Sequence, residues 1–331
     1  MSIQMLKRQR GVALLTVLLV VAIVTVLSAA LIARQQLVIR STTNQQLARQ
    51  AWHYALGGEA LAQVVLEQDF KAAGANPGEQ VDHLEEAWAR SLPVFDIQQG
   101  EISVRIEDPL ARFNLNSLWY NNKLNQAALD QFRRLLQRLE LNPAYAERLL
   151  DWLDADQQVR GELGAEDNAY LGLQPDYRAG NQGMRDVTEL RLLLGMSEAD
   201  YRTLLPYVSV VMVPARLNVN TASPLLISTL ADGLDEQAVL TLLEGRGPSG
   251  YRQLADFLGK SALAGMAVQR DGLVLGSSFF IVRTEVRVAE RQQVVLSTLQ
   301  RDANGKVLVL SRNLGQASQR LARPKQIYME D

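Results

Sequence analysis

The chain has 331 residues, 47% of them hydrophobic and none of them cysteine, so it is long enough for about two or three folding units and contains neither disulfides nor thiolate metal sites. Its formal net charge is −2, and residues 1–11 hold basic residues but no acidic one, so the rest of the chain is mildly acidic. An acidic body is poorly suited to binding nucleic acid, because that binding depends on neutralisation of phosphates by Lys and Arg.

The N-terminal segment joins a short basic stretch to a long apolar one. Lys7, Arg8 and Arg10 are followed by Gly11 and then by an uncharged run over 12–33. A helix of this length is about 33 Å long and can cross a hydrocarbon core of about 30 Å. Because basic residues stay on the cytoplasmic side, we expect the N-terminus in the cytoplasm and the body exported.

Two simpler interpretations of this segment are an uncleaved signal anchor and a removed secretory signal peptide. The apolar run is longer than the roughly 7–15 residues of a secretory signal, which favours an anchor. Helical periodicity also continues, with apolar residues at spacings of three and four from Leu47 to Val65. We therefore predict one helix from Val12 to about Phe70, ended by the Gly- and Pro-containing stretch 74–78.

A basic leader that ends in glycine, an apolar run that starts at the next residue and a long amphipathic continuation resemble a type IV pilin or pseudopilin precursor. In that family a prepilin peptidase cuts after the glycine and N-methylates the new N-terminus. The resemblance implies cleavage between Gly11 and Val12 and methylation of Val12. The apolar helix is retained in that family because it packs the core of a fibre.

The fifth residue of the implied mature chain departs from the pilin pattern, because Thr16 stands where most pilins have Glu. A carboxylate inside a bilayer costs several kcal/mol unless it is paired. In pilins its proposed partner is the terminal amine of the subunit added before it. A subunit that enters first has no such partner, so the neutral Thr16 suits an initiating or tip subunit. The alternative is an ordinary helix residue in a signal anchor.

Alternation of apolar and polar residues predicts four strands, at 101–108, 279–288, 292–301 and 307–312. The last three form an antiparallel meander, with a short turn at 289–291 and a tight hairpin at Asn304-Gly305. We expect the first strand to join this meander and the sheet to pack on the long helix.

The residues between the first two strands have the periodicity of short amphipathic helices. These helices are predicted at 126–141, 144–155, 187–195, 197–208, 222–231 and 235–245. Capping residues at Asp186 or Thr188, at Ser197 and at Thr221 support their starts.

A helical domain inserted into a pilin body resembles the pseudopilin K family, which is also called general secretion pathway protein K. Its members are the largest minor pseudopilins of bacterial type II secretion. Further stretches resembling that family are 105–118, 151–170, 185–193 and 217–223. The resemblance implies an α+β fold, with a pilin-like long N-terminal helix packed on an antiparallel sheet and a large all-α domain inserted between strands.

The expected organisation follows from this fold. The segments are a cleaved leader (1–11), the transmembrane part of the long helix (12–33), the periplasmic half of the helix with the first strand (34–108), the inserted all-α domain (109–275) and the C-terminal strands with a tail (276–331).

The resemblance implies a minor pseudopilin at the tip of the type II secretion pseudopilus. It would initiate and cap the fibre and control its length while folded proteins cross the outer membrane. The bulk of the insertion supports the tip, because a subunit stacked above would be obstructed. The protein would be a single-pass inner-membrane protein of a Gram-negative bacterium with a periplasmic body. Implied partners are pseudopilins I and J, with H as a further candidate, prepilin peptidase, the secretin, the inner-membrane platform, exoproteins and membrane lipid.

An acidic loop is the sharpest polar cluster in the chain. Six carboxylates between Asp151 and Asp167 stand against one cation, Arg160. Oxygen ligands at this density suit Ca²⁺, although the spacing does not fit an EF-hand. A solvated acidic loop is the alternative. The resemblance to pseudopilin K implies structural calcium, and the ligands we select are Asp154, Asp156, Glu166 and Asp167.

A rival function is suggested by 217–257, which resembles a helix-hairpin-helix DNA-binding module of a membrane-anchored receptor. The Gly-h-Gly clamp of that module is missing, and Asp232, Asp235 and Glu236 would meet the phosphates. The stretch 245–250 matches G-x-G-x-x-G but follows a predicted helix rather than a strand, so dinucleotide binding is not expected. With no G-x-S-x-G motif and no paired histidines, we do not expect an enzyme.

Overall fold

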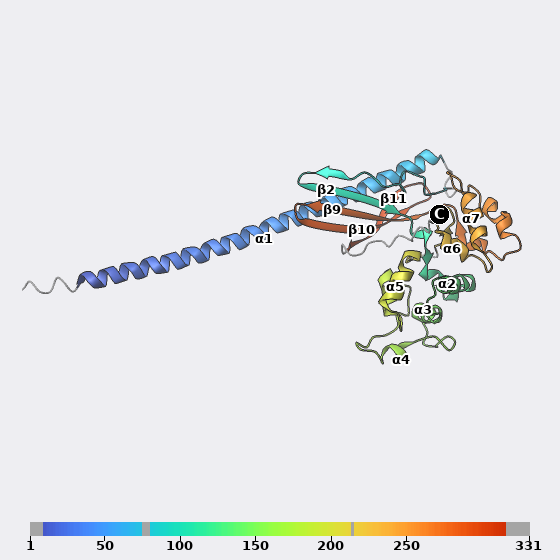
Figure 1. Ribbon diagram of the computed structural model, residues 1–331, viewed down its shortest axis with the longest axis horizontal. Helices are drawn as coiled ribbons and strands as arrows, with labels where there is room; N and C mark the ends of the chain where they lie inside the picture. The colour runs from blue at the N-terminus through green and yellow to red at the C-terminus, as the bar shows by residue number, and fades with distance from the viewer. Residues whose placement is uncertain (1–8, 75–79, 213–214, 316–331) are drawn as a thin grey trace, which may run out of the picture.

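The computed structural model of the chain describes residues 9–74, 80–212 and 215–315. One long helix, α1 (Gln9–Ala73), projects as a rod from the rest of the molecule (Figure 1). An antiparallel sheet lies along the C-terminal half of this rod, and a group of short helices lies beyond and beside the sheet. The expected α+β architecture is confirmed.

The two halves of α1 have different environments. Between Val12 and Gln46 every residue is exposed, whereas Ala51, Ala55, Ala62 and Leu66 are buried against the sheet. Their spacing of four or seven residues places them on one face of the helix. The helix begins and ends within a few residues of the predicted limits. It stops at Gly74, whose φ of +58° suits glycine and closes helices.

The sheet has five strands in the order β1-β2-β9-β10-β11, and all neighbours are antiparallel. The strands are β1 (Phe95–Ile97), β2 (Gly100–Glu107), β9 (Phe279–Val288), β10 (Arg291–Arg301) and β11 (Val307–Gly315). The four predicted strands are therefore confirmed, and the first of them does join the meander. The sequence prediction missed β1, because three residues are too few to show an alternating pattern.

The loop between β10 and β11 is wider than the predicted tight hairpin. It spans 302–306, and only Gly305 of the Asn304-Gly305 pair has a positive φ, of +83°. The carboxylate of Asp302 shapes the loop by accepting the amide hydrogens of Asn304 and Lys306, each at 2.9 Å.

Helix α1 is fixed to the sheet by an ion pair whose carboxylate is buried and whose arginine is partly exposed. Glu59, 4% exposed, accepts hydrogen bonds from Nε and Nη2 of Arg312 at 2.8 Å and from the hydroxyl of Ser297. Burial by itself would raise the pKa of Glu59, but the hydrogen bonds from Arg312 and Ser297 bring it below its usual value. The charge is therefore paired inside the helix–sheet interface.

The residues between β2 and β9 form the helical insert, which has its own hydrophobic core around Phe132, Leu149 and Tyr170. A second, separate core lies between α1 and the sheet. The α-helices of the insert are α2 (Gln126–Arg138), α3 (Tyr145–Leu153), α4 (Asp167–Tyr170), α5 (Glu198–Leu204), α6 (Pro224–Ser228), α7 (Glu236–Glu244) and α8 (Leu254–Leu258).

Shorter elements complete the insert. Its 3₁₀ helices are Pro109–Ala111, Leu115–Leu118, Val187–Leu192, Leu205–Tyr207, Ser261–Leu263 and Arg270–Gly272. Two-residue strands pair as β3 (Phe113–Asn114) with β6 (Val208–Ser209), β4 (Trp119–Tyr120) with β5 (Lys123–Leu124), and β7 (Leu217–Asn218) with β8 (Leu273–Val274).

Two local predictions for the insert need correction. The segment predicted as a helix at 187–195 is a 3₁₀ helix, whose capping box of Asp186 and Glu189 tightens the first turn. Helix α6 is capped by Ser223 rather than Thr221, since Pro224 occupies the first helical position and the hydroxyl of Ser223 accepts the amide hydrogen of Leu226.

Two adjacent glycines of α1 provide a matched test of the helix–sheet packing. A Cβ at Gly58 would lie 2.6 Å from Thr284 Cγ2 and 2.9 Å from Val104 Cγ2, whereas a Cβ at Gly57 meets nothing within 4 Å. We expect Gly58→Ala to lower the free energy of unfolding by about 1–3 kcal/mol through overpacking. Gly57→Ala should raise it by up to about 1 kcal/mol through helix propensity. Thermal unfolding of both variants in detergent measures this, and equal effects would contradict the packing.

Candidate functional site

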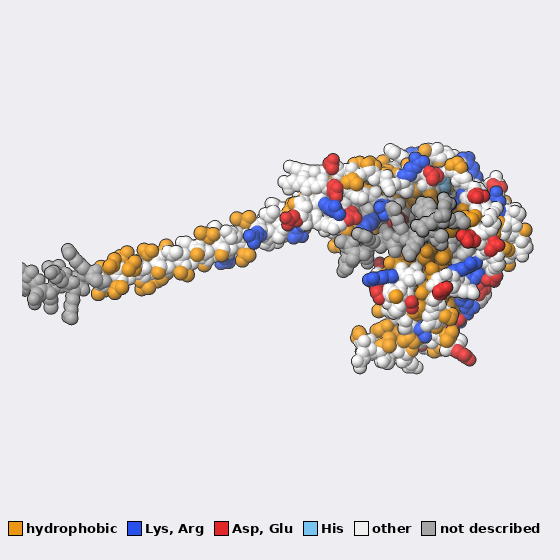
Figure 2. Space-filling model, viewed as in Figure 1, with side chains coloured by type: hydrophobic (Ala, Val, Ile, Leu, Met, Phe, Trp, Pro, Cys, Tyr) orange, Lys and Arg blue, Asp and Glu red, His pale blue; other side chains and the backbone are white. Residues whose placement is uncertain are grey.

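The N-terminal half of α1 is an exposed apolar rod. Large apolar side chains from Val12 to Ile39 are each at least half exposed, and Figure 2 shows them around the shaft. Within the described ranges, α1 is the one helix long and apolar enough to cross a membrane. Such a surface is not stable in water, so it requires lipid or the apolar faces of other helices.

The polar groups of this rod are satisfied within the helix. The hydroxyl of Thr16 donates to the carbonyl oxygen of Ala13 at 2.9 Å, and that of Thr25 donates to Val21 at 2.7 Å. A threonine at this position therefore adds no unpaired charge to the apolar surface. Gly11 and Val12 lie inside the helix, residues 1–8 of the implied leader lie outside the described residues, and cleavage and methylation stay predictions.

The acidic loop joins α3 to α4 in the insert and gathers three of the four selected carboxylates. Asp154 is the C-cap of α3 and Glu166 precedes α4, so two helix ends position them. Oxygen atoms of Asp154, Asp156 and Glu166 lie within 4.8 Å of one another. Asp154 is fully buried and Glu166 is 3% exposed.

These carboxylates carry more negative charge than their surroundings neutralise. Arg160 donates from Nε to Asp154 at 2.7 Å and lies 3.8 Å from Asp156. One oxygen of Asp154 and both oxygens of Glu166 are buried with no hydrogen-bond partner among the described residues. Burial, with the neighbouring carboxylates, raises the pKa of Glu166 to about 7, and burial also raises the pKa of Asp154. Buried oxygens left without a donor fit a hard cation such as Ca²⁺.

The other acids of the loop have different partners. Asp151 is buried and accepts the amide hydrogens of Arg160 and Ala165, at 3.1 and 2.8 Å, so it folds the loop. Asp167, the fourth selected ligand, accepts the amide hydrogen of Ala179 at 3.0 Å and lies 3.5 Å from an exposed Arg178. Its carboxylate is outside the three-residue group. The sequence shows the acidic density, but the fold decides which carboxylates meet.

The helix-hairpin-helix-like segment presents acids to solvent. Asp232, Asp235 and Glu236 are exposed, and Asp232 lies 3.4 Å from Arg134 of α2. Asp235 caps α7 by accepting the amide hydrogen of Ala238. These roles account for the acids structurally, and their charge opposes a phosphate backbone.

The 245–250 stretch follows α7 and forms a turn whose middle, 247–249, is exposed. Gly245 lies against the ring of Tyr251, and Arg246 donates to the carbonyl oxygen of Ala222 at 2.7 Å. Burial lowers the pKa of Arg246 to about 10. Gly245 and Gly250 therefore serve close packing, against Tyr251 and Asn220, while the exposed Gly247 has a φ of +55° in a turn that follows a helix rather than a strand.

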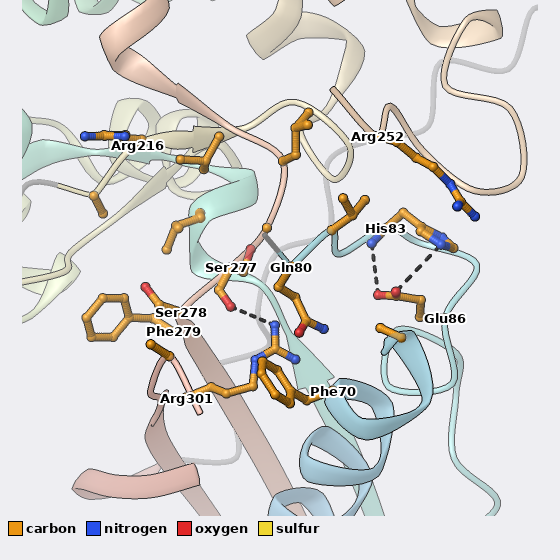
Figure 3. A pocket seen from close by; sticks show the side chains of 18 of the residues that line it. Phe70, Gln80, His83, Glu86, Arg216, Arg252, Ser277, Ser278, Phe279 and Arg301 are labelled. Atoms are coloured by element: carbon orange, nitrogen blue, oxygen red, sulfur yellow. Dashed lines mark hydrogen bonds and ion pairs between the residues drawn. The ribbon is translucent and has the colours of Figure 1, made fainter. Parts of the chain in front are cut away.

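A polar network that the sequence prediction missed lies where the insert meets the sheet. Asp108 follows β2 and accepts hydrogen bonds from the hydroxyls of Thr221 and Ser277 and from the amide of Asn218. Both carboxylate oxygens of Asp82 accept hydrogen bonds from Nη2 of Arg301, each at 2.6 Å. Figure 3 shows Arg301, Ser277 and His83 around the adjoining cleft. The stretches 105–118 and 217–223 contribute to this network, but nothing local in them indicates that they meet.

Comparison with known proteins agrees on one family. A family model described as type II secretion system protein K matches residues 111–213, and a second model of that description matches 217–276. The type II secretion system protein K of Pseudomonas aeruginosa is 49% identical, over 94% of this chain and 95% of that protein. The protein K of Klebsiella pneumoniae is 36% identical, over 89% of this chain and 93% of that protein.

A solved structure is also similar. It belongs to the GspK-GspI-GspJ complex from the enterotoxigenic Escherichia coli type 2 secretion system. The TM-score is 0.73 at 28% sequence identity, and the match covers 83% of this chain and 99% of that one.

Proposed function

The chain belongs to the protein K family of the type II secretion system, a family of minor pseudopilins, and from this premise we propose that it occupies the tip of the pseudopilus. There it initiates and caps the fibre, and so limits its length, while folded exoproteins are exported. It acts as a structural subunit rather than an enzyme.

The position of the helical insert carries the tip proposal. The sheet lies along the C-terminal half of α1, and the insert lies at the end of the sheet away from the apolar rod (Figure 1). In a fibre whose α1 helices run along the axis, the space beyond the sheet belongs to the next subunit. The insert fills that space, so a subunit of this shape fits where no further subunit is added.

Thr16 supports the same position. Its hydroxyl is satisfied by its own helix, so it needs no partner from a subunit ahead. A carboxylate at this depth would need one. We propose that the protein is anchored once in the inner membrane by residues 12–33, with a cytoplasmic N-terminus and a periplasmic body.

The solved complex of a related K subunit with GspI and GspJ suggests the partners. We propose that this chain assembles with its own pseudopilins I and J, and with H next in the fibre, through α1. Prepilin peptidase, the inner-membrane platform, the secretin and exoproteins are the further partners of such a subunit.

The tip position predicts one copy at one end of each pseudopilus. Gold-labelled antibody against the insert should mark a single end of isolated pseudopili, and full chain in detergent should retain pseudopilins I and J on purification. Labels distributed along the shaft would contradict the tip. Binding of duplex DNA at physiological salt, without I and J, would instead favour the receptor alternative.

The leader predicts a defined processing event. With prepilin peptidase present, Gly11→Ala should leave the precursor at full length, because the peptidase needs glycine before its cut. Gly57→Ala, a glycine of the same helix outside the leader, should be trimmed normally. Intact-mass measurement distinguishes the two products and detects methylation at Val12. Normal trimming of the Gly11 variant would reject the leader interpretation.

Calcium is proposed as a structural ion of the acidic loop, held by Asp154, Asp156 and Glu166 with Asp167 nearby. The unpartnered oxygens of Asp154 and Glu166 support this proposal. A bound divalent cation would neutralise the loop and join the end of α3 to the start of α4. The chemistry it supplies is charge neutralisation.

Calcium binding should appear as a gain in stability. At about one hundred times the dissociation constant, Ca²⁺ raises the free energy of unfolding by about 2.7 kcal/mol, and chelator removes the gain. Glu166→Gln should lose most of this response, whereas Asp130→Asn, a partly exposed acid of α2, should keep it. Thermal unfolding with and without Ca²⁺ measures the effect, and a chelator-insensitive melting temperature would leave the loop without an ion.

A further inference from the structure

The strongest unassigned feature is a group of buried charges at the point where α1, the following loop and the insert meet. The network around Asp108 connects the chain leaving β2 with Asn218 and Thr221 of the insert. Ser277, on the chain returning to β9, donates its hydroxyl to Asp108 and its amide hydrogen to Asp82. Both crossings between sheet and insert therefore depend on these two carboxylates.

Asp82 belongs to what we term the carboxylate cluster, formed by Asp69, Asp82 and Glu86. Asp69 lies near the end of α1, and the other two lie on the loop after it. Oxygen atoms of the three residues lie within 4.8 Å of one another. Asp82 is fully buried, and the other two are partly buried.

The cationic groups facing the cluster are fewer than its carboxylates. Arg301 of β10 is buried, contacts both oxygens of Asp82 at 2.6 Å and lies 3.5 Å from Asp69. His83 Nε2 lies 3.6 Å from Glu86. Two further charges influence the pKa of His83: Glu85 of the same loop raises it, and the exposed Arg252 of the insert lowers it. With one arginine inside, three charged carboxylates leave a buried excess of negative charge.

The other polar contacts of the cluster are hydrogen bonds donated to its carboxylates, and those to Glu86 favour its charged form without balancing the effect of burial. Glu86 accepts hydrogen bonds from the indole of Trp88 at 2.6 Å and from the amide of His83 at 3.0 Å. Gln80 donates to Asp69 at 3.5 Å. A cleft of about 1180 Å³, lined by His83, Glu86 and Arg301, connects the cluster with solvent. Protons can therefore reach it without unfolding.

We propose that the carboxylate cluster is a proton-dependent latch: with protons bound it holds the loop and the insert against the sheet, and when the protons leave, mutual repulsion loosens that hold. Trp88, which is 1% exposed and packs edge-on to Phe280 at 5.2 Å, carries the change from Glu86 into the helix–sheet core.

The direction of the pH dependence follows from the electrostatics. Burial, with Glu86 and Asp82 nearby, raises the pKa of Asp69 to about 7, and burial also raises the pKa of Glu86 to about 7. Burial raises the pKa of Asp108 to about 6. The folded state therefore binds more protons than the unfolded state, and this stability is lost as pH rises from about 4.5 to about 7.

The titration of His83 changes the stability in the opposite direction with pH. Burial lowers its pKa, so its contribution to stability is present at neutral pH and is lost as pH falls below about 6.5. The two kinds of group can thus be separated by titration and by substitution.

Trp88 provides a local reporter. The full chain, labelled with 5-fluorotryptophan and held in detergent without calcium, gives fluorine resonances that Trp88→Phe assigns. The Trp88 resonance should titrate with a midpoint near pH 7. Glu86→Gln should remove that transition, and Glu166→Gln, a matched change in the acidic loop, should leave it. A transition removed by His83→Gln but not by Glu86→Gln would overturn the proposal.

The hold on the insert is measured by a distance across the junction. The chain has no cysteine, so two introduced cysteines are the only attachment sites for spin labels. Labels at Val64→Cys on α1 and Asp232→Cys in the insert therefore report the single distance between these two positions. We expect a narrow distance distribution at pH 6 and a broader one at pH 8.5. Asp69→Asn with Glu86→Gln should keep it narrow at both. Equal widths at the two pH values in the unsubstituted background would reject the latch.

Discussion

Asp108 imposes the constraint on which the arrangement of the two cores depends. The chain leaves β2 directly before this residue and enters β9 two residues after Ser277, and Asp108 and Ser277 are hydrogen-bonded. Thr221 and Asn218 bind the same carboxylate from the insert. Displacing the insert from the sheet would take the donors Thr221 and Asn218 away from this buried carboxylate, which makes the displacement costly.

The same molecule must be apolar at one end and water-compatible at the other. The exposed rod of α1 needs lipid or neighbouring helices, while the sheet and insert bury their own cores. Glu59 lies within the packed C-terminal half of α1, and its pairing with Arg312 fixes the sheet along that half. This division explains how one continuous helix can serve both as an anchor and as the scaffold of a body.

Two groups of buried acids resolve their repulsion in different ways. The carboxylate cluster encloses Arg301, and its remaining charge is governed by protons that enter through the cleft. The acidic loop has Arg160 at its edge, and the oxygens of Glu166 have no donor among the described residues. The first arrangement suits an adjustable contact between units, and the second suits a bound cation that fixes a loop.

The sequence by itself determined what depends on neighbouring residues: the long helix from its three-and-four spacing and four strands from their alternation. The leader, read from charge beside an apolar run, stays a prediction. The sequence also identified the acidic loop by density. It could not identify β1, the 3₁₀ form of Val187–Leu192, or the meeting of Asp82 with Arg301, 219 positions apart. Strand β1 is too short to show alternation, and the turn of Val187–Leu192 has the same apolar pattern whether it is 3₁₀ or α. Only the tertiary structure decided the pairing of Asp82 with Arg301, because a buried charge is stabilised by a partner distant in the chain that no local pattern identifies.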